Sequence, residues 1–160
     1  MFIPFDQLPD NARVWVYPSS RKFTPDELLV IRQKTEAFLE QWTAHRTQLQ
    51  AGYDMPYDRF IVLGLNESIQ SASGCSIDAS VHFIQSLEET FKITLLDKMN
   101  VTFRNKNSIE HISLKEFRIK VKKKIFNSDV IVFNNLVQNK MEYDSLWEVP
   151  ASLSWHARYF

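Results

Sequence analysis

The sequence predicts an α+β fold: a ferredoxin-like βαββαβ core over about residues 10–105, followed by a helix/strand extension over about 106–160. Short segments typical of strands alternate with two long segments of helical apolar periodicity. No repeat, low-complexity segment or linker interrupts residues 1–160, so we expect a single domain. The core depends on a weak strand over 47–53. Without that strand, a three-layer α/β fold with a mixed sheet is the alternative.

The first strand and the first helix have the clearest sequence signals. The segment "ARVWVYP" (12–18) is rich in valine and aromatic residues and ends in proline, which is typical of a strand. The segment "TPDE" (24–27) combines an N-cap threonine, a proline at the first helical position and a glutamate that closes a capping box. We expect this helix to reach about residue 46, with His45 at the end of its buried stripe. The other members of that stripe are Leu28, Ile31, Thr35, Phe38 and Trp42.

Apolar runs and apolar periodicity also predict the remaining core elements. Residues 56–66 contain a nearly unbroken apolar run, which indicates a strand buried on both faces. After the segment "SASGCS", a second helix is predicted over about 76–91. Residues 99–105 alternate again, with Val101 and Phe103 on one face of a strand.

The extension contains one ambiguous segment, "SLKEFRIKVKKKIF" (113–126). Its apolar residues fit helical spacing and partly fit strand alternation. Ser113 and Glu116 can form a capping box, so we predict a helix. A strand is predicted over 129–133, and the aromatic tail is expected to pack against the rest of the molecule.

Composition limits the class of protein. Hydrophobic residues make up 44% of the chain and aromatic residues 13%, enough for a sizeable core. With 19 basic and 19 acidic residues the formal net charge is zero, which argues against a nucleic-acid partner. The single cysteine excludes an intrachain disulfide and suits a reducing compartment. The start "MFIPFDQLPD" does not fit a signal peptide, and no apolar run approaches about 18 residues, so we expect a cytoplasmic protein without a membrane span.

Four segments of the chain are distinctive: "RVWVYPSSRKFTPDE", "FLEQWTAH", "SASGCSIDASVHFIQSLE" and "SWHARYF". Together they resemble a family of small uncharacterised bacterial proteins whose members often carry the label "ABC transporter ATPase", and the resemblance covers nearly the whole chain. It implies no catalytic residues, because the family has no assigned activity. The label can be tested here, since a phosphate-binding loop requires the pattern G-x-x-x-x-G-K-[ST]. The only glycines are Gly52, Gly64 and Gly74; no two are five apart and none precedes a lysine, so we reject ATP hydrolysis.

The segment "SASGCSID" (71–78) is the most site-like stretch. Free N–H groups at a helix start favour an anion, and a thiol there gains thiolate character. The same pattern also fits plain helix capping, with Ser73 or Ser76 as the cap, Asp78 complementing the helix dipole and Cys75 packed as a small apolar residue. Both alternatives stay open. The candidate anion-binding residues are Ser71, Ser73, Gly74, Cys75 and Ser76.

A nucleophilic Cys75 would need a histidine base; of His45, His82, His111 and His156, the candidates retained are His45 and His156. His82 lies four residues after Asp78 and fits a surface pair better. No histidine or cysteine spacing matches a metal-binding motif, so we expect neither a metal nor another cofactor. Enzyme activity therefore stays open, and the missing motifs weigh against it.

Five of the seven residues over 118–124 are lysine or arginine. Exposed aromatic residues do not interleave with them, so we predict a solvated helix face rather than a nucleic-acid interface. The sequence thus predicts a small non-enzymatic binding or adaptor protein. Its ligand would be a small anion at 71–78, or a protein partner contacting the tail at 147–160. The alternative is a small enzyme that uses Cys75 with a histidine base.

Overall fold

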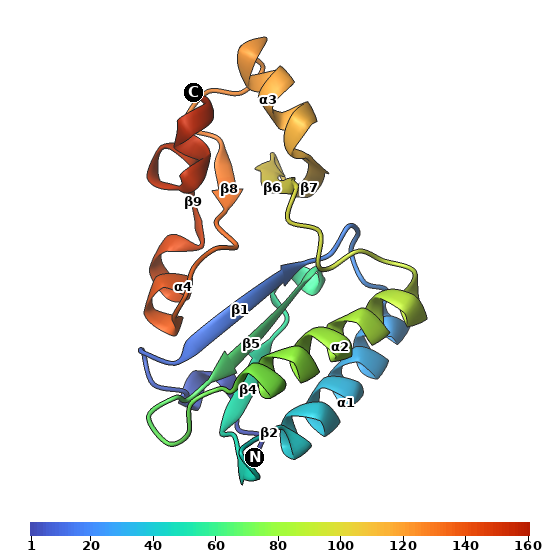
Figure 1. Cartoon of the computed structure of the whole chain (residues 1–160). Coiled ribbons are helices and arrows are strands. Elements are labelled where there is room, and N and C mark those ends of the chain that lie inside the picture. The colour runs from blue at the N-terminus through green and yellow to red at the C-terminus, as the bar shows by residue number, and fades with distance from the viewer.

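The computed structural model describes residues 1–160 and contains two main antiparallel sheets, each with its own helices (Figure 1). The α+β class is confirmed. The first unit holds a sheet of strand order β1-β5-β4, and the second a sheet of order β7-β6-β8-β9. The elements of the first unit are β1 (Arg13–Pro18), α1 (Pro25–Gln41), β2 (Thr43–Ala44), β3 (Thr47–Gln48), β4 (Ala51–Asp54), β5 (Phe60–Leu65) and α2 (Gly74–Phe91). Those of the second are β6 (Asn100–Asn105), β7 (Ser108–Ser113), α3 (Leu114–Lys122), β8 (Ile131–Phe133), α4 (Lys140–Leu146) and β9 (Glu148–Pro150).

Helices α1 and α2 cover one face of the first sheet (Figure 1). The capping box at the start of α1 is confirmed: Thr24 Oγ1 accepts the Glu27 N–H at 3.2 Å, and Glu27 Oε1 accepts the Thr24 N–H at 2.9 Å. Each residue of β5 is buried, as expected for a central strand. The main core therefore lies between this sheet and the two helices.

Helix α1 ends at Gln41, several residues earlier than predicted. The backbone of Trp42 is extended and ends the helix. Its indole N–H donates to the Ser76 carbonyl at 2.8 Å, and this hydrogen bond fixes the chain against α2. The prediction that His45 continues the buried stripe is therefore wrong. His45 is exposed, with φ 51°, in the turn between β2 and β3.

The ferredoxin-like topology is not confirmed for the whole core. Strand β6, predicted to complete the first sheet, pairs instead with β7 and β8 in the second sheet. Its neighbour β7 forms a tight hairpin with it, and this local pairing needs no long loop closure. The consequence is that β1 has one full partner strand, β5, and lies at an edge of its sheet.

In the second unit, the ambiguous segment is helical in α3, which ends at Lys122 rather than near residue 126. Ser113 caps this helix by accepting the Glu116 N–H at 3.1 Å. Strands β7 and β9 and helix α4 are not predicted from the sequence. They are short or half-exposed, so their apolar periodicity is weak. No helix of the molecule combines the length and apolarity that a membrane crossing requires.

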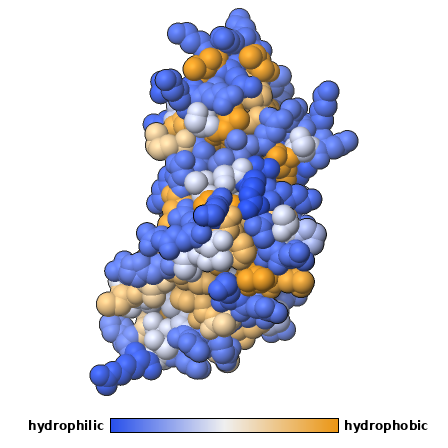
Figure 2. Space-filling view, turned by 90° about the vertical axis from the view of Figure 1, so that its right-hand side faces the viewer, coloured by the Kyte–Doolittle hydropathy of each residue, from blue (hydrophilic) through white to orange (hydrophobic).

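The two units are joined by an aromatic cluster, which we call the inter-sheet cluster and define as Phe60, Phe133, Tyr143 and Trp147. The Trp147 ring centroid lies 4.8 Å from that of Phe60, 4.9 Å from that of Phe133 and 5.0 Å from that of Tyr143. Only Phe60 belongs to the first sheet, so Trp147 packs across the boundary. Outside such contacts, the face in Figure 2 is mainly hydrophilic, with hydrophobic groups in separate small patches.

Arginine 59 provides a second, polar link between the units. Its guanidinium donates to the Ile109 carbonyl of β7 at 2.8 Å and to the Ser20 carbonyl at 3.0 Å. Burial lowers the pKa of Arg59 from its ordinary value. Together with the inter-sheet cluster, this arginine fixes how the second unit sits against the first.

The contribution of the inter-sheet cluster to the stability of the protein can be measured with the variant Trp147→Ala. We expect this change to lower the free energy of unfolding by about 3–5 kcal/mol, because it empties a large buried aromatic site. Urea unfolding followed by circular dichroism gives the value. Leu153→Ala is the matched control: its side chain is 66% exposed, so its effect should stay within about 0.5 kcal/mol. Equal midpoints for the two variants would show that the cluster does not hold the units together.

Candidate functional site

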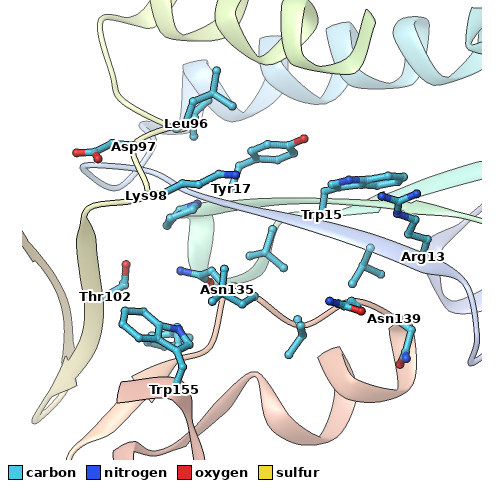
Figure 3. A pocket seen from close by; sticks show the side chains of 18 of the residues that line it. Arg13, Trp15, Tyr17, Leu96, Asp97, Lys98, Thr102, Asn135, Asn139 and Trp155 are labelled. Atoms are coloured by element: carbon cyan, nitrogen blue, oxygen red, sulfur yellow. The ribbon is translucent and has the colours of Figure 1, made fainter. Parts of the chain in front are cut away.

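A cleft of about 740 Å³ lies between the two units along β1 (Figure 3). The side chains of Trp15 and Tyr17 form part of its wall on the side of the helices. Asn135 and Trp155, from the second unit, lie on the other side of the strand. The loop between α2 and β6 closes one end with Asp97 and other residues. A cleft with aromatic walls and a few polar groups is the usual form of a binding site.

The backbone edge of β1 runs through this cleft. Near one end of the strand, Val14 donates its N–H to the Gln138 carbonyl at 3.0 Å. Alternate residues of an antiparallel strand direct their backbone groups to the same edge, so the N–H and C=O of Val16 also face outwards. No group of the protein pairs with them there. The cleft therefore exposes an open stretch of strand edge.

The segment around Asn139 already pairs with the N-terminal end of this edge. Arg13 and Asn139 form an isolated antiparallel bridge, and the Lys140 N–H donates to the Ala12 carbonyl at 2.9 Å. The segment before Asn139 then turns away from β1, so the pairing stops at Val14. The edge is thus able to accept an antiparallel strand, and beyond Val14 it is unpaired.

The wall on the helix side combines aromatic rings with charged groups. The Arg13 guanidinium lies over the Trp15 ring, 4.7 Å from its centroid, and 3.9 Å from the Glu67 carboxylate. Burial raises the pKa of Tyr17 to about 12, so its hydroxyl, which faces the Ser80 side chain of α2, stays protonated. Lys98 and Asp97 add one charge of each sign. The cleft is therefore polar without a net excess of either charge.

The opposite wall holds two buried polar atoms without a partner, Trp155 Nε1 and His156 Nε2. The His156 side chain is fully buried, its Nδ1 lies 2.7 Å from Ser154 Oγ, and its ring stacks on Trp155 with 3.8 Å between centroids. Burial lowers the pKa of His156 to about 4, so the ring is neutral near pH 7. Both residues line the cleft, so the wall on this side carries an indole and a neutral imidazole.

Asn135 is oriented by the inter-sheet cluster. The Trp147 indole N–H donates to Asn135 Oδ1 at 2.9 Å, which leaves the amide Nδ2 of Asn135 without a partner in the protein. The cluster that joins the two units therefore also positions a hydrogen-bond donor in the cleft.

The five candidate anion-binding residues in 71–78 lie at a helix start and do not line this cleft, whereas Ile77 of the same segment does. Ser73 and Ser76 make a reciprocal capping box, with N···O distances of 3.1 and 2.8 Å, and the carboxylate of Glu67 accepts the Ala72 N–H at 3.1 Å. Ser71 and Gly74 are exposed. Asp78 is the fifth residue of α2, beyond its first turn. The capping alternative therefore accounts for the two serines.

Cys75 is exposed, in contrast to the expectation that it packs as a small apolar residue. No hydrogen bond joins it to a histidine. His45 lies in the exposed turn between β2 and β3, and His156 is buried in the second unit with Ser154 as its hydrogen-bond partner. The structure thus brings neither candidate base into hydrogen-bond contact with the thiol. No group of three or more acidic, histidine or cysteine side chains is placed to hold a metal ion.

Comparisons with protein-family models, with curated protein sequences and with solved structures find no match to this chain. The chemistry of the cleft is therefore the evidence for function.

The open edge of β1 predicts fast amide exchange at Val16 in the free protein. The N–H groups of Trp15 and Tyr17 face β5 and are paired, whereas that of Val16 faces the cleft. We expect Val16 to exchange with deuterium on the order of 100-fold faster than its two neighbours, since unpaired amides open without unfolding. Residue-resolved NMR exchange measures the three rates. Equal protection of all three amides would show that another group already occupies this edge.

Proposed function

We propose that this protein is a non-enzymatic adaptor that binds an extended peptide segment of a partner protein as an added strand along β1. The observation that carries the proposal is the unpaired backbone of Val16, which faces a cleft of about 740 Å³. In strand addition, main-chain hydrogen bonds supply affinity and the flanking pockets supply specificity. Both kinds of contact are available here.

The backbone groups define how the peptide would pair. The C=O of Val14 and the N–H and C=O of Val16 offer one donor and two acceptors on one edge. Pro18 has no N–H, so it offers only an acceptor at the other end of the strand. From Val14 to Pro18 the edge covers about 13 Å at the usual rise of a strand. A segment of about five residues would fill it.

The side-chain walls fit a peptide better than a small anion. In an extended peptide, successive side chains point to opposite faces, so one row meets Trp15 and the other meets Asn135 and Trp155. A small anion would instead need a surplus of positive charge. The carboxylates of Asp97 and Glu67 offset Lys98 and Arg13 in this cleft. An anion site at 71–78 stays a prediction, and the Glu67 carboxylate at that helix start disfavours it.

The fold of the first unit supports the same proposal. Apart from the small β2-β3 hairpin, its elements follow the order β1-α1-β4-β5-α2, and this order and the sheet order β1-β5-β4 are compatible with a ferredoxin-like core without its last strand. In such a core the last strand lies beside the first. We therefore propose that the bound peptide takes the position that β6 leaves unfilled, and that the first unit is an incomplete ferredoxin-like sheet.

A random peptide library displayed on phage, selected against the intact protein, tests this function. Peptides recovered from it are then labelled and titrated by fluorescence anisotropy. Val16→Pro removes the outward N–H and keeps the bonds to β5, so we expect at least about tenfold weaker binding. Val16→Thr is the matched control, because it keeps the N–H and the strand propensity; its affinity should change less than about threefold.

Circular dichroism and the urea midpoint establish that both variants are folded. The proposal fails if the library gives no binder, or if folded Val16→Pro binds the selected peptides as tightly as the parent protein.

A further inference from the structure

A second hollow, a groove of about 900 Å³, lies between α3 and the C-terminal residues at the top of the molecule in Figure 1. Its lining includes several cations and no aspartate or glutamate side chain. None of these cations takes part in an ion pair. In a chain of zero net charge, the groove is therefore a local patch of positive charge. The cations are Lys115, Arg118, Lys122, Lys124 and Arg158.

The acidic residue nearest in sequence does not neutralise the patch. Glu116 follows Lys115 directly, but its carboxylate lies 3.7 Å from the Nζ of Lys120, one turn further along α3. Neither Glu116 nor Lys120 lines the groove. The five lining cations are left to interact with solvent or with an external anion.

Aromatic residues lie in the same groove as these cations. Phe126, Tyr159 and Phe160 line it, and the Phe160 side chain is 43% exposed. The guanidinium groups of Arg118 and Arg158 lie 5.7 and 5.9 Å from the centroid of the Tyr159 ring. Aromatic rings and cations that share one groove are typical of proteins that bind single-stranded nucleic acid.

The buried ring of Phe117 holds this arrangement together. Its centroid lies 5.5 Å from Phe126, 6.5 Å from Tyr159 and 6.0 Å from Phe160. The C-terminal residues are thus packed on α3 through the apolar face of the helix, while the basic face lines the groove. The sequence argued against nucleic acid because no aromatics interleave with the basic run 118–124. The fold brings Tyr159 and Phe160 beside this run from the C-terminal end of the chain.

We propose that this groove binds single-stranded nucleic acid, with phosphates on the lysine and arginine side chains and a base stacked on the exposed ring of Phe160. A duplex already stacks its bases on one another and would gain only from the cations. An acidic peptide would likewise leave the Phe160 face unused. This site is separate from the edge of β1, and it does not depend on the function proposed for that edge.

The probe is a labelled oligo-dT of about twelve nucleotides, titrated by fluorescence anisotropy between about 50 and 200 mM salt. We expect binding that weakens with salt. The double variant Lys122→Gln/Lys124→Gln should lower the affinity several-fold and reduce the slope of log K against log salt by about 1.4, or about 0.7 for each phosphate contact. Lys34→Gln, an exposed lysine of α1, is the matched control and should change neither quantity.

The stacking contribution is tested with Phe160→Ala. Loss of one stacked base should weaken binding at least about fivefold and leave the salt slope unchanged. Val16→Pro should have no effect, which separates this site from the edge of β1.

Three outcomes would overturn the proposal. One is the absence of oligo-dT binding at low salt. Another is equal affinity for an oligo-glutamate peptide of the same length, which would indicate an acidic protein partner. The third is equal affinity for duplex DNA together with unchanged binding by Phe160→Ala, which would indicate charge attraction alone.

Discussion

The packing of Trp147 against Phe60 is the contact on which the rest of the structure depends. It belongs to the inter-sheet cluster, which joins the two units at one face of the first sheet and leaves the outer edge of β1 uncovered. The same tryptophan orients Asn135 in the cleft through its indole N–H. This buried aromatic residue therefore contributes both to the position of the second unit and to the geometry of the candidate site.

Features that arise from local sequence could be predicted well. Thr24 and Ser113 cap helices as expected, because capping depends only on residues three positions apart. The burial of β5 on both faces follows from its apolar run. His45 was misplaced because helical periodicity continues past Gln41, whereas the indole of Trp42 forms a long-range hydrogen bond to Ser76 and the helix stops there. Local pattern cannot reveal a contact between segments more than thirty residues apart.

The candidate sites depend on such distant contacts, which explains why the sequence pointed elsewhere. The segment 71–78 looked like a site because its serines and glycine stand out, and helix capping accounts for Ser73 and Ser76. The outer edge of β1 lies in the cleft and β6 pairs in the second sheet, a choice of partner that strand alternation does not determine. The basic groove needs Phe160 beside α3, which only the packing of the C-terminal residues on Phe117 provides.

The most direct test of strand addition is an NMR measurement on the complex with a peptide selected from the library. Nuclear Overhauser effects between the Val16 amide proton and the backbone protons of the peptide report whether the two strands are adjacent. If the peptide pairs with β1, Val16 should show these cross-peaks, whereas the amides of Trp15 and Tyr17, which face β5, should show none. A bound peptide that shows no cross-peaks with the Val16 amide proton would contradict the proposed mode of binding.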